Sequence, residues 1–282
     1  MKKIATLAIV SLFAFPSNAE KRMVSAGFGV TEIIYALQAQ DNLIAADFTS
    51  RNLIKGDNKK QLGLHIQLSS EGILSLNPTH LIGTNEMGPK IVLEQVKNSG
   101  VKVVILPSGQ NVPDLLARID TLAKVTDTKF KAEALKQRVN NDIFLLKQNQ
   151  CSNKPNVIFF MLDVSGSTKI GGDNTAIDRI IMLAGGNNPA KKQINGYKSV
   201  SMESMGDMNP EYILVSQRAW DIYKSADAIL DKLPILRSTG AGMKKNILIV
   251  PSSALLGGIG LESINLAKEL NNHFCKKIEL ER

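Results

Sequence analysis

One segment of this 282-residue chain constrains the fold more than any other. Residues 128–150 contain neither glycine nor proline, and their apolar residues recur at helical spacing. Such a run predicts a single helix of roughly 30 Å at 1.5 Å per residue. Strand and helix patterns alternate on both sides of it, which is typical of mostly parallel sheets covered by helices. We therefore predict an α/β protein with two similar lobes, residues 20–127 and 151–282, joined by one long interdomain helix, residues 128–150.

A short phrase occurs in both halves of the chain. Residues 68–84 read LSSEGILSLNPTHLIGT, and residues 200–216 read VSMESMGDMNPEYILVS. Superposition pairs Ser69 with Ser201, Glu71 with Glu203, and Asn77-Pro78 with Asn209-Pro210. A second similarity, IIYALQAQDN with IIMLAGGNN, precedes the phrase in each half. One match alone could be chance, because Asn-Pro before a strand is a common turn. Two matches in the same order favour two similar lobes.

The first 19 residues have the pattern of a secretory signal peptide. Two lysines precede an apolar run, and Ser17-Asn18-Ala19 forms a small-residue cleavage site. A membrane anchor is the alternative, but the run ends at Pro16 and is shorter than the ~20 apolar residues that a spanning helix needs. We expect cleavage after Ala19 and no direct membrane anchor. In a Gram-negative cell, the exported protein would reside in the periplasm.

Charge and cysteine content narrow the possible partners. The formal net charge is +8, but the basic residues are scattered and aromatic residues are only 5% of the chain, which argues against nucleic-acid binding. A mild preference for anionic ligands is the simpler interpretation. In an oxidising compartment, the even pair Cys151 and Cys275 favours a disulfide over two free thiols.

The predicted architecture itself suggests a function. Two α/β lobes leave a cleft between the carboxyl ends of their sheets, where such folds usually hold ligands. One stiff helix between the lobes permits only a modest rocking motion. An exported protein of this kind fits a carrier that delivers a small molecule to a membrane importer.

Five stretches resemble the periplasmic binding proteins of hemin ABC importers. They read RMVSAGFGVTEIIYALQAQDNLIAADFTS, LGLHIQLSSEGILSLNPTHLIGT, GPKIVLEQVKNSGVKVVILP, and, in the second half, GGDNTAIDRIIMLAGGNN with GYKSVSMESM. The larger class has a long backbone helix and also serves siderophores and cobalamin. The resemblance implies heme as the transported ligand and an inner-membrane ABC importer permease as the partner. A ferric siderophore or cobalamin is the alternative ligand, and we expect a monomer.

The resemblance also implies a role for the repeated glutamate. In this class, one acidic residue on each lobe docks against arginines of the permease, and Glu71 and Glu203 stand at equivalent places. Paired charges of this kind fix orientation and speed encounter. Alternatively, each glutamate only favours the first turn of a helix capped by Ser69 or Ser201.

The expected iron ligand departs from the family pattern. The family usually has a tyrosine after the glycine that precedes the LS-EG phrase, with an arginine two residues later. These positions hold Leu64 and Ile66 here, and leucine cannot bind iron. His65, one residue further on, is the leading candidate, because imidazole is a common axial ligand of heme iron. The other two histidines, His80 and His273, fit packing or surface positions better.

The second lobe offers weaker candidates for the opposite face of the heme. They are Tyr197, Tyr223, and Met161 with the loop 163–172. Tyr197 belongs to the GYK phrase, but bracing the loop is a better fit for it than ligation. The heme propionates require cations, and the candidates are Arg51, Lys59, Lys60, Lys169 and Arg218.

An enzyme is the competing class. GFGVTE lacks the G-x-G-x-x-G pattern of a dinucleotide turn, and Ser165-Gly166-Ser167 lacks the frame of a nucleophile elbow. With three histidines and no credible triad, we predict that the protein is not an enzyme.

Overall fold

The N-terminal lobe is built on a five-stranded parallel sheet of order β3-β2-β1-β4-β5. The computed structural model describes residues 20–162 and 168–275, so the predicted signal peptide, residues 1–19, lies outside the described residues. The elements of this lobe are β1 (Met23–Ala26), α1 (Phe28–Ala36), η1 (Gln40–Asn42), β2 (Leu43–Ala46), η2 (Phe48–Ser50), β3 (Lys60–Gln61), η3 (His65–Gln67), α2 (Ser70–Leu74), β4 (His80–Thr84), α3 (Lys90–Asn98), β5 (Lys102–Leu106) and α4 (Val112–Thr126), where η marks a 3-10 turn.

The C-terminal lobe repeats this strand order with one strand reversed. Its sheet runs β10-β9-β6-β7-β8, so β6 takes the central place that β1 has in the first lobe. The elements are β6 (Val157–Leu162), β7 (Thr168–Gly171), α6 (Ala176–Leu183), η4 (Pro189–Lys192), β8 (Tyr197–Lys198), α7 (Met202–Asp207), β9 (Tyr212–Ser216), α8 (Gln217–Tyr223), α9 (Ala226–Lys232), η5 (Pro234–Ser238), α10 (Gly240–Lys244), β10 (Ile247–Val250), η6 (Ser252–Leu255) and α11 (Leu261–Phe274).

One prediction for this lobe is wrong. Residues 163–172 are predicted to form a loop, whereas the described residues Thr168–Gly171 form β7, antiparallel to β6 and β8. The segment joins the sheet because pairing with Phe160–Leu162 satisfies its backbone hydrogen-bonding groups. The predicted α/β fold with two similar, mostly parallel lobes is otherwise confirmed.

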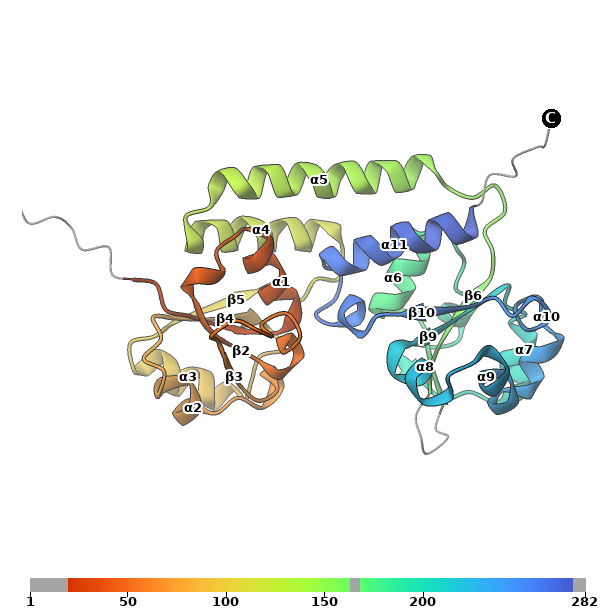
Figure 1. Cartoon of the computed structure of the whole chain (residues 1–282), viewed down its shortest axis with the longest axis horizontal. Coiled ribbons are helices and arrows are strands. Elements are labelled where there is room, and N and C mark those ends of the chain that lie inside the picture. The colour runs from red at the N-terminus through yellow and green to blue at the C-terminus, as the bar shows by residue number, and fades with distance from the viewer. Residues whose placement is uncertain (1–19, 163–167, 276–282) are drawn as a thin grey trace, which may run out of the picture.

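The long helix α5 (Lys129–Gln148) joins the two lobes. Its buried residues follow one stripe at helical spacing, comprising Ala132, Leu135, Val139, Ile143 and Leu146. The stripe faces α4 in the first lobe and α11 in the second, which lie beneath α5 in Figure 1. Among residues 20–162 and 168–275, no helix combines the length and apolar character that a membrane span requires.

A single hydrophobic cluster extends across both lobes. Successive residues of a strand face opposite sides of its sheet, so Met23 and Val157 face the helices under α5 while Val24 and Ile158 face away. The side under α5 continues through α4, α5, α6 and α11 as one cluster, whereas the outer side of each sheet has its own core. The two lobes are therefore coupled by packing as well as by chain connection.

Two buried charged side chains of the N-terminal lobe bind the C-terminal lobe directly. Arg118 of α4 donates from Nη1 to the carbonyl of Gly257 at 2.9 Å and from Nη2 to the carbonyl of Ile259. Glu32 of α1 accepts the first two backbone N–H groups of α11 at 2.9 and 3.2 Å, which caps that helix. Burial raises the pKa of Glu32 to about 7. We call these contacts the interlobe seam.

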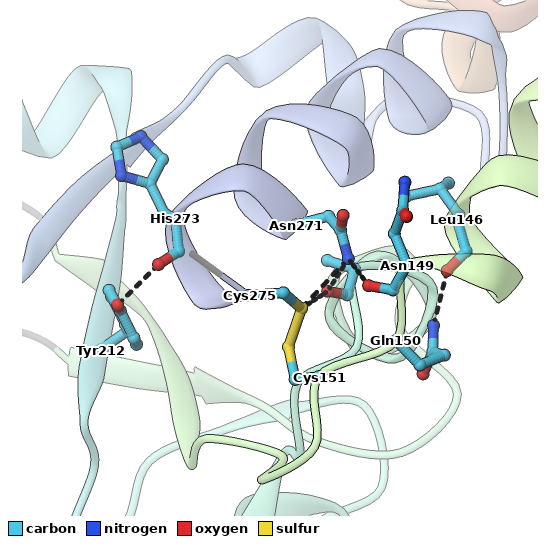
Figure 2. The surroundings of a disulfide bond; sticks show 9 residues. Leu146, Asn149, Gln150, Cys151, Tyr212, Asn271, His273 and Cys275 are labelled. Carbon is cyan, nitrogen blue, oxygen red and sulfur yellow. Dashed lines mark hydrogen bonds between the residues drawn. A yellow bond between two sulfur atoms is a disulfide. The ribbon is translucent and has the colours of Figure 1, made fainter. Parts of the chain in front are cut away.

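A disulfide joins Cys151, just after α5, to Cys275, at the end of α11 (Figure 2). The two Cα atoms are 4.8 Å apart, within the range that a disulfide requires. Beside the bridge, the Asn271 side chain donates to the carbonyls of Asn149 and Ala184 at 2.9 and 3.1 Å. The ends of two helices that both contact the shared core are thereby fixed together.

The repeated phrase occupies equivalent places in the two lobes. Ser69 and Ser201 cap α2 and α7, accepting from the backbone N–H groups of Gly72 and Ser204 at 3.3 and 3.2 Å. Each helix leads through an asparagine with positive φ, Asn77 or Asn209, into the strand that pairs with the central strand of its sheet. The repetition in sequence therefore corresponds to a repetition in structure.

Candidate ligand-binding site

A pocket of about 260 Å3 lies where the two lobes meet, at the carboxyl ends of the strands. The N-terminal lobe contributes His65, Glu86 and residues 108–110, which follow β3, β4 and β5. The C-terminal lobe contributes residues 174–176, Arg179, Tyr197 and residues 255–259. We call this the interlobe pocket. Its floor is formed in part by residues 257–259, which the interlobe seam holds.

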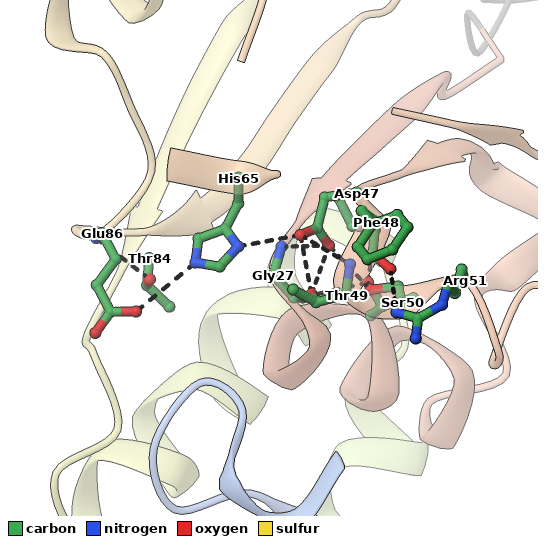
Figure 3. Close-up of polar contacts among 11 residues, drawn as sticks. Gly27, Asp47, Phe48, Thr49, Ser50, Arg51, His65, Thr84 and Glu86 are labelled. Atoms are coloured by element: carbon green, nitrogen blue, oxygen red, sulfur yellow. Dashed lines mark hydrogen bonds and ion pairs between the residues drawn. The ribbon is translucent and has the colours of Figure 1, made fainter. Parts of the chain in front are cut away.

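His65 sits in this pocket between two carboxylates (Figure 3). Its Nδ1 lies 3.0 Å from Oδ2 of Asp47, and its Nε2 lies 3.8 Å from Oε2 of Glu86. The hydrogen bond to Asp47 raises the pKa of His65; burial opposes this effect and Glu86 adds to it. The imidazole is only 17% exposed. Its neighbours in the chain, Leu64 and Ile66, are apolar and 39% and 52% exposed, which suits contact with an apolar ligand.

Asp47 is fully buried and accepts several hydrogen bonds at once. Besides His65, its donors are the backbone N–H of Gly27 at 3.0 Å, the hydroxyl of Thr49 at 2.9 Å and the hydroxyl of Ser50 at 3.1 Å. Burial alone would favour the neutral acid, but these hydrogen bonds, that of His65 foremost, keep the pKa of Asp47 below its usual value. Asp47 is therefore an ionised acceptor aimed at His65.

Buried hydroxyl groups hold Asp47 in place. The Ser50 hydroxyl lies 2.7 Å from that of Thr31, which lies 2.8 Å from that of Ser25. These residues come from η2, α1 and β1 and are all buried. The orientation of His65 thus depends on a network rooted in the central strand of the lobe.

Tyr197 lies on the other side of the interlobe pocket. It belongs to the short strand β8 and packs edge-on against Phe159, with ring centroids 6.3 Å apart. Burial raises the pKa of its hydroxyl to about 12. Iron ligation by a phenolate would require loss of that proton, and Tyr197 stays the weaker candidate that the sequence predicts.

A second pocket of about 350 Å3 adjoins the first on the C-terminal lobe. Leu255 and Leu256 line both pockets. The second pocket adds Met161, Lys169 and Arg218, which the sequence analysis names as candidates. An apolar wall and two exposed cations therefore continue from the interlobe pocket.

The structure does not bring the remaining candidates to these pockets. Lys59 and Lys60 line a separate pocket near the beginnings of β1 and β2, because the chain passes there before it runs along β3 towards His65. Tyr223, at the end of α8, packs against the outer core of the C-terminal lobe. Arg51 lies over the ring of Phe48, 4.2 Å from its centroid, on the turn that follows Asp47 (Figure 3).

The other two histidines lie outside both pockets. His80, at the beginning of β4, has Nδ1 2.9 Å from the hydroxyl of Thr79. His273 is exposed near the end of α11. Both positions agree with the packing and surface roles predicted for them.

Three residues of the site are missing from the sequence predictions. Asp47 directly follows β2, and a carboxylate at the carboxyl end of a predicted strand could have been recognised. Arg179 lies in the first half of α6, and a helical pattern alone does not show which of its side chains faces a pocket. Glu86 follows β4, but its proximity to His65 depends on how two loops fold together.

The two repeated glutamates lie outside the pockets. Glu71 and Glu203 are exposed, each in the first turn of its helix, α2 and α7. A carboxylate in this position also favours the helix electrostatically. Both the docking interpretation and the helix-start interpretation are compatible with these positions.

Two α/β lobes around a pocket, with one long helix between them, define a class of binding proteins. The family model described as "Periplasmic binding protein" matches residues 23–254, and the chain belongs to this family. Membership supports the prediction that the protein is a binding component of a transport system rather than an enzyme.

Three individual proteins show which members of the family this chain is similar to. The periplasmic heme-binding protein HutB of Vibrio cholerae is 40% identical, with a TM-score of 0.85, over 90% of this chain and 99% of its own. The heme-binding protein RhuT of Roseiflexus sp. RS-1 is 29% identical, with a TM-score of 0.83, over 92% and 99%. The vitamin B12-binding protein of Yersinia pestis (strain Pestoides F) is 20% identical over 216 residues, 77% of this chain and 76% of its own.

Proposed function

We propose that the protein captures hemin in the interlobe pocket and delivers it to the permease of an ABC importer. The observation that carries the proposal is His65, a pocket-lining imidazole whose Nδ1 is engaged by Asp47 and whose Nε2 lies 3.8 Å from Glu86, which also lines the pocket. The similarity to HutB and RhuT supports hemin over the other ligands of the class. A cobalamin or a ferric siderophore is the alternative, and the more distant vitamin B12-binding relative is its support.

The pocket chemistry suits an iron porphyrin with two carboxylates. His65 would bind the iron from the N-terminal lobe. The exposed Leu64 and Ile66 beside it, and Leu255, Leu256 and Met161 opposite, would contact the apolar macrocycle. Lys169, Arg179 and Arg218, all from the C-terminal lobe, would pair with the propionates.

Location and delivery complete the proposal. Residues 1–19 would direct export and be removed after Ala19. The mature protein would then act as a monomer in the periplasm. The disulfide supports an oxidising compartment. Glu71 and Glu203, exposed at equivalent positions of the two lobes, would each meet a basic residue of the permease.

The test is a titration of the purified protein with hemin, followed by its Soret absorption. We expect tight binding with a shifted Soret band, and His65→Ala should change that band and weaken binding at least about tenfold, because even outer partners of a metal ligand contribute 10- to 100-fold. His273→Ala, at an exposed histidine outside the pocket, is the matched control. Parallel titrations with a cobalamin and a ferric siderophore test the alternatives. Binding of either in place of hemin would refute the hemin proposal, and an unchanged spectrum in His65→Ala would place the iron ligand elsewhere.

A further inference from the structure

The two ring nitrogens of His65 have different environments. Nδ1 faces Asp47, which is buried and accepts hydrogen bonds from every neighbour named above. Nε2 faces Glu86 on the pocket side, and the Glu86 side chain is 52% exposed. A neutral imidazole has one N–H proton, which sits on the nitrogen that donates a hydrogen bond. The other ring nitrogen keeps a free lone pair.

We propose that Asp47 is a positioning residue that fixes the Nδ1–H tautomer of His65 and so presents the Nε2 lone pair to the interlobe pocket. This inference rests on the proposed function, because it explains how His65 would be oriented to bind the iron of hemin. Asp47 would not touch the bound iron porphyrin; it would act through the imidazole. The Glu86 side chain, which is 52% exposed, would turn away from Nε2 to let the ligand approach.

The fixed orientation of Asp47 makes the proposal specific. Gly27 donates to Oδ1 at 3.0 Å, and so does Ser50 at 3.1 Å, whereas His65 faces Oδ2. The backbone N–H of Gly27 cannot turn away, and the Ser50 hydroxyl is held in turn by Thr31. An amide at this position would therefore keep its oxygen at the Oδ1 place, because an NH2 group there would leave the buried N–H of Gly27 unpaired.

Asp47→Asn tests this arrangement because it changes one atom. Gly27 would retain the amide oxygen at the Oδ1 position, which places the amide NH2 group opposite Nδ1 of His65 and gives up the 3.3 Å hydrogen bond from the Thr49 N–H to Oδ2. Nδ1 would then become an acceptor, and the ring proton would move to Nε2. The variant would hold an imidazole of the same shape whose pocket-side nitrogen has no free lone pair.

The primary readout needs no hemin. Long-range 1H–15N correlation spectra of the apoprotein, recorded at alkaline pH where the ring is neutral, report which nitrogen of His65 carries the proton. We expect the Nδ1–H tautomer in the wild type and the Nε2–H tautomer in Asp47→Asn. Hemin titration should then show a 10- to 100-fold weaker affinity and a changed Soret band in the variant. Asp41→Asn, at an exposed residue of the same lobe, is the matched control and should change neither readout.

The outcomes separate this inference from the proposed function. An Nε2–H tautomer in the wild type would overturn the inference even if hemin binds tightly, and that measurement stands even if Asp47→Asn fails to fold. Unchanged tautomer and affinity in a folded Asp47→Asn would overturn it as well. Absence of hemin binding by the wild type would refute the proposed function, while the tautomer would still decide what Asp47 does.

Discussion

The charged residues around the ligand pockets are divided between the lobes by sign. Asp47 and Glu86 come from the N-terminal lobe, whereas Lys169, Arg179 and Arg218 come from the C-terminal lobe. Within the described residues, none of these three cations takes part in an ion pair. This division implies that a bound hemin would direct its iron to the N-terminal lobe and its propionates to the other.

Arg179→Gln tests that orientation. We expect hemin affinity to fall about fivefold, since one partly exposed charge pair contributes ~1 kcal/mol at most. Hemin dimethyl ester, which lacks the propionate charges, should bind wild type and variant equally. Arg138→Gln, on the exposed side of α5, serves as the control. An equal loss of affinity for hemin and for its ester would show that Arg179 acts through packing rather than charge.

At single residues, the ligand role of His65 stays a prediction, and the structure adds where the residue lies. His65 is the one histidine in a loop that follows a strand, and it does lie in the interlobe pocket. Lys59 and Lys60 are near His65 in sequence, but β3 carries the chain away from them before the pocket begins. The hydrogen bond from His65 to Asp47 joins loops 18 positions apart, and no spacing rule predicts such a contact.

Among the elements, α2 and α7 have the same design, so the repeated sequence places an exposed glutamate at the equivalent position of each lobe. Each begins with a serine cap, carries a glutamate in its first turn and ends in an asparagine turn before the strand that pairs with the central strand of its sheet. The helix-start role of Glu71 and Glu203 requires no partner, whereas docking requires both lobes to be engaged together.

The variant Glu71→Ala/Glu203→Ala separates these roles. We expect unchanged hemin affinity, because neither residue lines a pocket, and strongly reduced hemin uptake by cells or reconstituted importer. Each change removes one favourable charge from a helix start, which should cost only about 0.3–1 kcal/mol of stability. Glu94→Ala/Glu269→Ala, a pair of exposed glutamates elsewhere, should transport normally. Normal uptake by the Glu71/Glu203 variant would assign these residues to helix stabilisation alone.

Most elements could be predicted because their patterns are local. The long helix was expected over residues 128–150 and spans Lys129–Gln148, since the absence of glycine and proline together with the apolar stripe is decisive there. The strands β3, β7 and β8 are short and form only through their partners, so their sequences carry little signal of their own.

For the whole molecule, the interlobe seam and the shared core determine how far the lobes can move. Arg118 and Glu32 connect the first lobe to residues 257–262 of the second, right beside the interlobe pocket. Separation of the lobes would uncap α11 and leave a buried guanidinium and a buried carboxylate without partners, which is costly. We therefore expect small rocking motions on ligand binding rather than wide opening.

Glu32 also gives the seam a pH dependence. Burial raises its pKa from 4.5 to about 7, so between these values the unfolded chain loses its proton before the folded protein does. The unfolding free energy should therefore fall as pH rises through this window, by on the order of 3 kcal/mol at most. Glu32→Gln has no carboxyl group that titrates at this position. The unfolding free energy of the wild type minus that of the variant should therefore decrease between about pH 5 and about pH 8. Denaturant unfolding at both pH values measures this difference, with Glu94→Gln as the exposed control. A difference that does not vary with pH would mean that Glu32 is ionised throughout.

The disulfide has a consequence for a carrier that works among extracytoplasmic proteases. Cys151 and Cys275 enclose almost all of the lobe that holds Tyr197, Lys169 and Arg218. A single cut of the peptide chain anywhere between the two cysteines leaves both fragments covalently attached. The C-terminal lobe can thus be cleaved once without losing a fragment, because the disulfide holds the two pieces together. The hydrophobic core shared by the lobes would keep those pieces folded around the ligand pockets.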